Sequence, residues 1–322
     1  MNQRRLRANQ HIRDLASEVT LSHKEMIQPL FIDQELSKPV PNQFMSGVYT
    51  DTIESVLHQI ESDLKNGTNK FLLFPVPEHK AEKDFNFDFA ASVIAHIKKR
   101  FGDDVWLAPD LCLCSYTTHG HCGVLDATKS RMLDDETVVI LSRYALQLAQ
   151  SGADCIAPSD MTDGRIKGIR TILDQNGLDT TSIMSYSSKF SSGYYGPFRD
   201  VCKSAPDKTI KIQNRSTYQI DYRNGSDAIA SSLRDIQEGA DIIMVKPCIP
   251  YLDIVTKLHQ QVKVPIAVYH VSGEYAGFEL LVKNNLMDRT QGLIEIWTAC
   301  KRAGAGIIIT YAAREAKRII NG

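Results

Sequence analysis

Short apolar runs of strand length alternate along the chain with longer stretches in which apolar residues recur every three or four positions. The short runs predict β-strands, and the spacing within the longer stretches predicts amphipathic helices. We expect eight strands, at 28–32, 70–74, 105–110, 154–157, 182–186, 242–246, 266–270 and 306–310. Helices are expected between them, for example at 52–66, 87–100, 134–151 and 252–261.

This alternation predicts the fold class. Eight successive βα units indicate an α/β protein whose parallel sheet closes into a single (β/α)8 TIM barrel. We expect the barrel to occupy residues 26–322, after an extended N-terminal arm at 1–25 that has no core of its own and contacts a neighbouring subunit. Barrel chemistry collects at the C-terminal ends of the strands, so reactive side chains should follow the eight runs.

Composition excludes several classes of protein. The 322 residues include 37 Lys and Arg against 38 Asp and Glu, so no overall field attracts nucleic acid or an anionic membrane. No apolar run approaches the roughly 18 residues that a bilayer span needs. Seven cysteines without a secretory leader indicate a reducing compartment. We therefore expect a cytoplasmic protein with no nucleic-acid or membrane partner.

Three cysteines gather in the loop after the third expected strand. Cys112, Cys114 and Cys122 share this loop with His119 and His121. Three soft thiolates with an open fourth position are typical of a catalytic zinc site, whereas a fourth protein ligand would make the site structural. Either histidine could be that fourth ligand, and three incidental buried cysteines are the plain alternative.

Two lysines follow consecutive expected strands. Lys189 comes after the fifth strand, and Lys246 ends the sixth. Burial and a second nearby cation both disfavour the ammonium form, so each lysine could be a neutral amine that attacks a carbonyl carbon. Either one alone could equally be a salt-bridged side chain. The presence of both on neighbouring barrel strands favours paired Schiff-base chemistry.

More than 50 residues separate the fifth and sixth strands, which leaves room for a lid at about 190–222 in addition to a helix. Arg199 and Arg215 in this segment suit capture of a carboxylate, and closure of the segment would exclude water. Ser272 and Tyr311, after the last two strands, could hold a second carboxylate. As isolated residues, all four would more often be ordinary surface or core side chains.

Five segments resemble, in order, the signatures of the porphobilinogen synthase family, also called 5-aminolevulinate dehydratase; they are 110–123, 157–165, 184–200, 244–253 and 269–275. The resemblance extends from about Arg4 to Tyr311. It implies condensation of two 5-aminolevulinate molecules into porphobilinogen with loss of two waters, a step of tetrapyrrole biosynthesis. It also implies a Schiff base on Lys246 with the substrate that becomes the propionate side, and one on Lys189 with the other substrate.

The resemblance implies further roles for side chains and for the assembly. It assigns the first carboxylate to Ser272 and Tyr311, the second to Arg199, Arg215 and Gln219, and the lining of the site to Asp110, Ser159 and Tyr195. Cys112, Cys114 and Cys122 match the zinc-using branch, and the family commonly forms a homo-octamer through its arm. Ser231 stands where many bacterial members bind an allosteric magnesium (Mg²⁺) through a carboxylate, which argues against that ion here.

Two other hypotheses compete with membership of the porphobilinogen synthase family. A class I aldolase is also a Schiff-base barrel, but it needs one lysine and no thiolate metal site. A zinc-binding barrel that has lost its activity and serves as a scaffold would normally have lost a nucleophile. Because Lys189, Lys246 and the cysteine loop are all present, the sequence favours the synthase.

Overall fold

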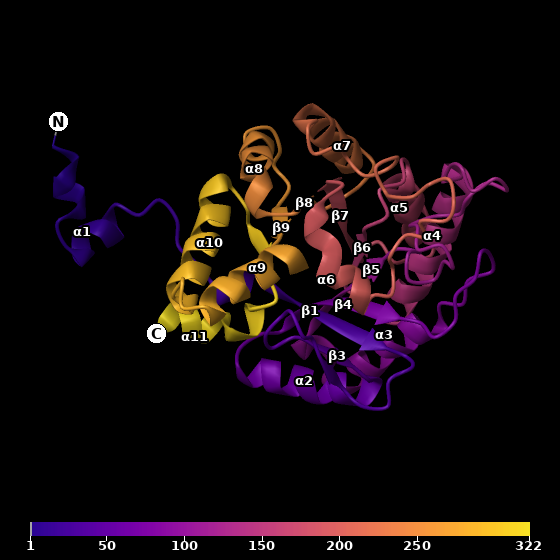
Figure 1. Ribbon diagram of the computed structural model, residues 1–322, viewed down its shortest axis with the longest axis horizontal. Coiled ribbons are helices and arrows are strands. Elements are labelled where there is room, and N and C mark those ends of the chain that lie inside the picture. The colour runs from indigo at the N-terminus through magenta and orange to yellow at the C-terminus, as the bar shows by residue number, and fades with distance from the viewer. Residues whose placement is uncertain (1) are drawn as a thin grey trace.

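Eight parallel strands form a closed barrel in the computed structural model, which describes residues 2–322 (Figure 1). The strands follow one another around the barrel in chain order, and the last pairs with the first. They are β1 (Met26–Asp33), β4 (Lys70–Val76), β5 (Trp106–Leu111), β6 (Cys155–Pro158), β7 (Ser182–Lys189), β8 (Ile242–Lys246), β9 (Ile266–Tyr269) and β10 (Ile307–Ile309). The predicted (β/α)8 barrel and its eight strands are confirmed.

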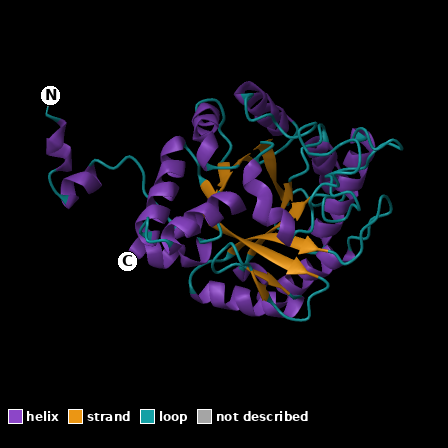
Figure 2. Ribbon diagram, in the orientation of Figure 1, coloured by secondary structure: helices purple, strands orange, loops and turns teal. Residues whose placement is uncertain are grey.

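Helices surround the strands, as Figure 2 shows. The barrel helices are α2 (Ile53–Lys65), α3 (Asp88–Phe101), α4 (Asp134–Gln150), α5 (Arg165–Gln175), α7 (Gly225–Gln237), α8 (Leu252–His259), α9 (Ser272–Lys283), α10 (Arg289–Ala303) and α11 (Ala316–Asn321). The four helices predicted by position match α2, α3, α4 and α8 to within two residues at each end. Within residues 2–322, no helix has both the length and the apolar character that a membrane crossing requires.

The helical elements of residues 2–25 are all short. These are the 3₁₀ helices η1 (Gln3–Arg7) and η2 (His23–Glu25), with α1 (Gln10–Leu15) between them. None of the three buries a residue, and Figure 1 shows η1 and α1 standing away from the barrel. The exposed Leu6 and Leu15 are apolar side chains without an intramolecular core to enter.

Strand β7 is three residues longer than predicted, and the difference moves Lys189 from a loop to the end of the strand. The register of β7 with β8 shifts between Ser185 and Ser188, an irregularity typical of a β-bulge. The polar run 187–189 does not look like a strand in the sequence. Here the Ser188 hydroxyl holds it, because that hydroxyl donates to the Ala228 carbonyl oxygen at 2.9 Å.

A short hairpin between β1 and α2 was not predicted. Strand β2 (Val40–Pro41) pairs antiparallel with β3 (Tyr49–Asp51), which itself joins β1 in parallel. Both strands are too short to show an alternating pattern in the sequence. The hairpin lies outside the closed ring of eight strands.

The segment 190–222 leaves the barrel at β7 and returns to the same place. The Ile220 amide donates to the Lys189 carbonyl oxygen at 3.1 Å, and the Phe190 amide donates to the Lys246 carbonyl oxygen at 2.9 Å. Between these two stems lie η4 (Gly193–Tyr195) and α6 (Gly196–Val201). The Phe198 ring of α6 meets the Phe74 ring of β4 edge-on, with centroids 5.0 Å apart. The segment therefore packs over the barrel mouth.

A buried ionic network fixes the outer side of β7. Arg165, which is fully buried, donates to the Asp235 carboxylate and to the Ser185 hydroxyl, each at 3.1 Å. The Ser185 hydroxyl in turn donates to Asp235 at 2.6 Å, and Asp160 lies 3.4 Å from the Arg165 Nε. The network thus joins α5, α7 and the β6 loop to the strand that carries Lys189.

We expect Asp235→Ala to lower the free energy of unfolding by about 3–5 kcal/mol, because it leaves the Arg165 charge buried without its main partner. Urea denaturation at one protein concentration measures the change. The matched control is Asp163→Ala, since the Asp163 side chain is 75% exposed in its pair with Arg234 and such pairs contribute about 1 kcal/mol at most. Equal effects of the two substitutions would contradict this account.

Candidate active site

The two predicted lysines lie side by side at the mouth of the barrel. Lys189 and Lys246 are register partners on β7 and β8, and only 5% and 3% of their surfaces are exposed. Both line one small enclosed cavity, together with Asp110, Cys114, Ser159, Tyr195, Phe198 and Arg215. The cavity has a volume of about 10 Å³, which is about enough for a single water molecule.

Aromatic rings surround the amine of Lys246. Its Nζ lies 4.1 Å from the ring centroid of Tyr269, 4.9 Å from those of Tyr186 and Phe198, and 5.5 Å from that of Tyr195. We call these four residues the aromatic cage. Burial, and then the nearby charge of Lys189, lower the pKa of Lys246 to about 7. A substantial fraction of this amine is therefore neutral and nucleophilic at neutral pH.

A carboxyl group and a hydroxyl lie next to Lys189. The Lys189 amine donates to the Ser159 carbonyl oxygen, and the Ser159 hydroxyl donates to Asp110 Oδ2 at 3.1 Å. Burial raises the pKa of Asp110 to about 6, although the charge of Lys189 opposes the rise. Its Oδ1 is buried without a hydrogen-bond partner. Asp110 can therefore gain or lose a proton near neutral pH within the lysine site.

The three predicted cysteines converge in one cluster. The Sγ atoms of Cys112, Cys114 and Cys122 all lie within 4.8 Å of one another, and all three residues are buried. Tetrahedral zinc with bonds of about 2.3 Å would hold its sulfur ligands roughly 3.8 Å apart. Hydrogen bonds from Cys112 and Cys122 hold the pKa of Cys114 well below its usual range. The pKa values of Cys112 and Cys122 are raised, Cys112 chiefly by burial, so Cys114 is the thiol that ionises first. The donor type and the spacing fit a zinc ion.

Within residues 2–322, neither His119 nor His121 belongs to the cysteine cluster. Both ring nitrogens of His121 are engaged elsewhere, Nδ1 with the Tyr218 hydroxyl at 3.0 Å and Nε2 with the Ile212 carbonyl oxygen at 2.9 Å. His119 Nδ1 accepts from the His121 amide at 3.2 Å. The described cluster therefore consists of three thiols, and His121 ties the cysteine loop to segment 190–222.

Arg215 lines the lysine cavity, and the segment that carries it, 190–222, also holds buried polar atoms without partners among the described residues. Arg215 donates to the carbonyl oxygens of Gly120 and Ser204, at 2.9 and 2.7 Å. Its Nε, the Nε of Arg199 and both side-chain amide atoms of Gln219 are buried without a hydrogen-bond partner. Burial and the charge of Arg215 lower the pKa of Arg199. Because buried polar groups without partners are costly, this cluster suits an anionic ligand such as a carboxylate.

Ser272 and Tyr311 both contact members of the aromatic cage. The Ser272 hydroxyl, at the start of α9, accepts from the Phe198 amide at 3.1 Å. The Tyr311 hydroxyl lies 3.3 Å from that of Tyr269. Both residues are buried. The structure thus brings the two predicted carboxylate binders to the Lys246 side of the site.

Sequence reasoning missed Tyr186 and Tyr269 as members of the site. Tyr186 lies on the same strand as Lys189, and Tyr269 ends the strand that follows Lys246. Aromatic residues near the C-terminal ends of strands next to a lysine strand would have been the available signal. Glu274 was also missed, because an acid in the first turn of a helix is ordinarily assigned to capping. Its carboxylate accepts from the Ile249 and Val271 amides, at 2.6 and 2.7 Å.

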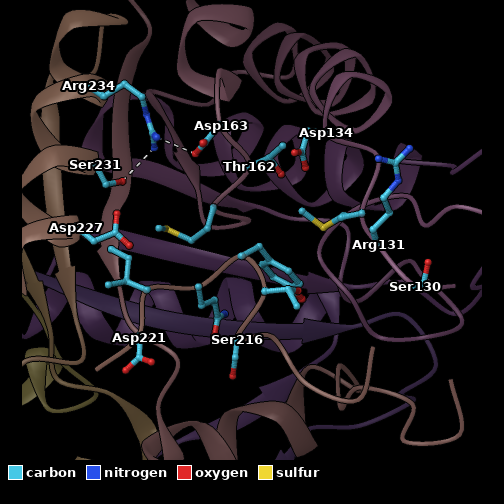
Figure 3. A pocket seen from close by; sticks show the side chains of 16 residues that line it. Ser130, Arg131, Asp134, Thr162, Asp163, Ser216, Asp221, Asp227, Ser231 and Arg234 are labelled. Atoms are coloured by element: carbon cyan, nitrogen blue, oxygen red, sulfur yellow. Dashed lines mark hydrogen bonds and ion pairs between the residues drawn. The ribbon is translucent and has the colours of Figure 1, made fainter. Parts of the chain in front are cut away.

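A larger hollow of about 590 Å³ is lined in part by Gln219, and Figure 3 shows the side chains around it. It is lined by polar residues that include Gln219, Asp163, Ser231 and Arg234, and it contains neither lysine and none of the three cysteines. Arg234 donates to the Ser231 hydroxyl at 3.1 Å and pairs with Asp163 at 2.8 Å. The chemically reactive groups therefore lie in the smaller cavity, not in the larger hollow.

Two buried lysines that share a cavity with Cys114, one of three clustered thiols, define a barrel with the side chains of an enzyme site. Comparisons with known proteins give its family. The family model described as delta-aminolevulinic acid dehydratase matches residues 1–319. The dehydratase of Helicobacter pylori is 43% identical over 323 residues, which cover 98% of each chain. That of Archaeoglobus fulgidus is 39% identical and covers 97% of this chain and 95% of its own.

A solved structure agrees with these relatives. The dehydratase of Toxoplasma gondii, also named porphobilinogen synthase and solved with its product porphobilinogen, superposes with a TM-score of 0.93 at 37% identity. The match covers 99% of this chain and 91% of that chain. The chain belongs to the delta-aminolevulinic acid dehydratase family. This membership confirms the family and the lyase class predicted from the motifs, while the roles of individual residues stay predictions.

We expect the reaction of Lys246 with a small ketone, trapped by cyanoborohydride, to increase with pH through a midpoint near 7, because the neutral amine forms above its pKa. Mass spectrometry of the Lys246 peptide measures the adduct. Lys189→Met should move the midpoint upward, since it removes the nearby cation. An unperturbed lysine would titrate at about 10.4, so a midpoint there for Lys246 would contradict the assignment.

Proposed function

We propose that this chain is a zinc-using porphobilinogen synthase that condenses two 5-aminolevulinate molecules with loss of two waters, through Schiff bases on Lys246 and Lys189, in tetrapyrrole (heme) biosynthesis. The observation that carries the proposal is the buried pairing of these lysines beside three clustered thiols. A class I aldolase would need only one lysine and no thiol cluster. The chemistry therefore favours joining two carbonyl substrates in one site.

Lys246 is suited to start the reaction. Its neutral amine attacks the ketone carbon of one 5-aminolevulinate, and loss of water leaves a positively charged iminium. The faces of the aromatic cage attract a cation, most strongly when water is excluded. The Tyr269 ring, 4.1 Å from the Nζ, thus supports the iminium more than it supports the neutral amine. In this way the cage lowers the free energy of the Schiff base.

Lys189 would form the second Schiff base. An iminium withdraws electrons better than a ketone, so it eases formation of the enamine that makes a carbon–carbon bond. Asp110 and Ser159 lie beside this amine, and the pKa of Asp110 is about 6. Together with Tyr195, whose hydroxyl donates to the Lys246 carbonyl oxygen at 3.1 Å, they would position the substrate and hold protons.

The two substrate carboxylates have separate partners in this proposal. Ser272 and Tyr311 would bind the first, on the Lys246 side of the site. Arg199, Arg215 and Gln219 would bind the second, because each offers a buried donor atom that has no partner among residues 2–322. A guanidinium donates two parallel hydrogen bonds to a carboxylate, which fixes the orientation of the bound substrate.

Cys112, Cys114 and Cys122 would hold the zinc ion. When bound, zinc acts as a Lewis acid that polarises an oxygen or amine of the second substrate. Arg215 contributes positive charge beside the cluster and favours the thiolate form of Cys114. The fourth coordination position of the zinc ion would be left to water or substrate, as in other catalytic zinc sites. Ser231 offers no carboxylate for an allosteric magnesium, so we propose none.

Segment 190–222 would act as the lid. A cavity of about 10 Å³ has no room for two substrate molecules, so a wall has to move before they bind. The segment supplies Tyr195, Phe198 and Arg215 to that cavity. The hydrogen bond between His121 and the Tyr218 hydroxyl would hold the closed lid against the cysteine loop.

The N-terminal arm supports the expected assembly. Leu6 and Leu15 are exposed on turns that make no core of their own, and docking on a second copy would cover them. We propose a homo-octamer built through the arm at 1–25. All seven cysteines are free thiols, which suits a reducing compartment such as the cytoplasm.

Purified protein should form a pyrrole from 5-aminolevulinate, lose this activity on chelation and regain it when zinc is added back, because the proposed reaction depends on the metal. A colorimetric pyrrole assay measures all three states. Lys246→Met, with its fold checked by circular dichroism, is the inactive control. Folded, reduced, zinc-loaded protein that forms no pyrrole would instead support a catalytically silent barrel.

Cys122→Ala should lower bound zinc per subunit several-fold, because it removes one of three thiolate ligands. Atomic absorption on dialysed protein measures the ratio. Cys155→Ala is the matched control: Cys155 is also fully buried, but it lies on β6 and its thiol contacts the Ile156 carbonyl oxygen. Unchanged zinc content in Cys122→Ala would mean that the ligand set is wrong.

A further inference from the structure

Cys248 and Cys300 form a second group of buried thiols, apart from the proposed zinc ligands. Cys248 lies in the loop after β8, and Cys300 lies on α10. Their Sγ atoms are 3.0 Å apart, and both residues are fully buried. A disulfide bond is about 2.05 Å long, so the sulfurs need to approach by only about 1 Å to bond.

The loop that carries Cys248 is joined to the proposed active site. Cys248 is two residues after Lys246, and its amide donates to the Glu274 carboxylate at 3.4 Å. The same carboxylate accepts from the amides of Ile249 and Val271. Glu274 thus links this loop to the start of α9, where Ser272 lies. A displacement of Cys248 would therefore reach both Lys246 and Ser272.

We propose that Cys248 and Cys300 form a reversible disulfide when the protein meets a peroxide, and that this modification lowers catalysis at Lys246. In the first step one thiol loses its proton, its sulfur attacks the peroxide and the O–O bond breaks; the proton joins the leaving hydroxide, so that a sulfenic acid and water form. In the second step the other thiol displaces the sulfenic oxygen as water and the S–S bond forms. The two thiols lose two electrons and two protons, and the peroxide is reduced to two waters.

Burial and the contact with Cys300 both affect the thiol of Cys248. The hydrogen bond to Cys300, and then burial, raise the pKa of Cys248 well above its usual range. A thiol with a raised pKa is a weak nucleophile, so Cys248 suits the second, resolving step. Hydrogen peroxide is small and neutral, so brief local opening is enough for it to reach a buried sulfur.

The bond would draw the Cys248 loop toward α10. Trp297 and Leu293, on the same helix as Cys300, are fully buried, and a close-packed core resists displacement. Most of the approach of about 1 Å would therefore fall on the loop after Lys246. Misplacement of a reacting group by about 1 Å can slow an enzyme about 10²-fold. This effect on activity rests on the proposed function, whereas formation of the bond does not.

The test treats reduced, zinc-loaded enzyme with increasing hydrogen peroxide, blocks the remaining thiols and digests the protein with trypsin without reduction. Because the Lys246–Pro247 bond resists trypsin, Cys248 falls in peptide 235–257, and Cys300 falls in peptide 290–301. We expect these two peptides to appear linked. Pyrrole formation should fall by at least about tenfold as the link forms and return with dithiothreitol, while zinc measured in the same samples reports damage to the cysteine cluster.

Two variants separate this pair from the other thiols. Cys300→Ala should form no link and keep its activity at peroxide doses that inhibit the unchanged protein, whereas Cys155→Ala should behave like the unchanged protein. Cys300→Val replaces the alanine variant if the latter is unstable. Absence of the link at a dose that already releases zinc would overturn the proposal.

Equal inhibition of Cys300→Ala would overturn the proposed effect on catalysis. Protein that forms the link but never forms a pyrrole would refute the proposed function and leave the disulfide established.

Discussion

The burial of two lysine side chains as neighbours on adjacent strands is the constraint on which the rest of the site depends. Removal of an ammonium group from water is costly, and two such groups also repel each other. The fold meets this constraint in different ways at the two positions. Lys189 has the Ser159 carbonyl oxygen and the Asp110 carboxyl group nearby, whereas Lys246 has the aromatic cage and loses much of its charge. The two amines are thereby held as neighbours in different environments, and the pKa of Lys246 is lowered to about 7.

This arrangement requires β7 and β8 to keep their register despite an irregularity in β7. The Arg165 network holds the outer side of β7 at Ser185, one residue before the bulge region begins. The Ser188 hydroxyl, which also lies 2.8 Å from that of Ser232, anchors the strand to α7 on the other side of the bulge. The position of Lys189 therefore depends on buried polar residues that lie outside the site.

Most of the fold could be predicted from the sequence, because the apolar runs are long enough to show strand and helix periodicity. The reactive residues could also be found, because cysteine, lysine and arginine after predicted strands are unusual. Of the aromatic cage, only Tyr195 was predicted as a site residue. Tyr186 and Tyr269 resemble ordinary strand residues, and their contact with Lys246 arises only when the barrel closes. The bulge in β7 and the pairing of Cys248 with Cys300 were likewise hidden, because both depend on contacts between distant parts of the chain.

Both stems of segment 190–222 are hydrogen-bonded to the backbone of the two lysines themselves. The Lys246 carbonyl oxygen accepts from the Phe190 amide and the Tyr195 hydroxyl, and the Lys189 carbonyl oxygen accepts from the Ile220 amide. Movement at these stems would therefore loosen the two lysines that we propose form the Schiff bases. Water would enter at the moment when the lysine geometry relaxes, so hydrolysis of a finished iminium and departure of the product would become a single event. In this way, the segment that closes the site would also determine when the product leaves it.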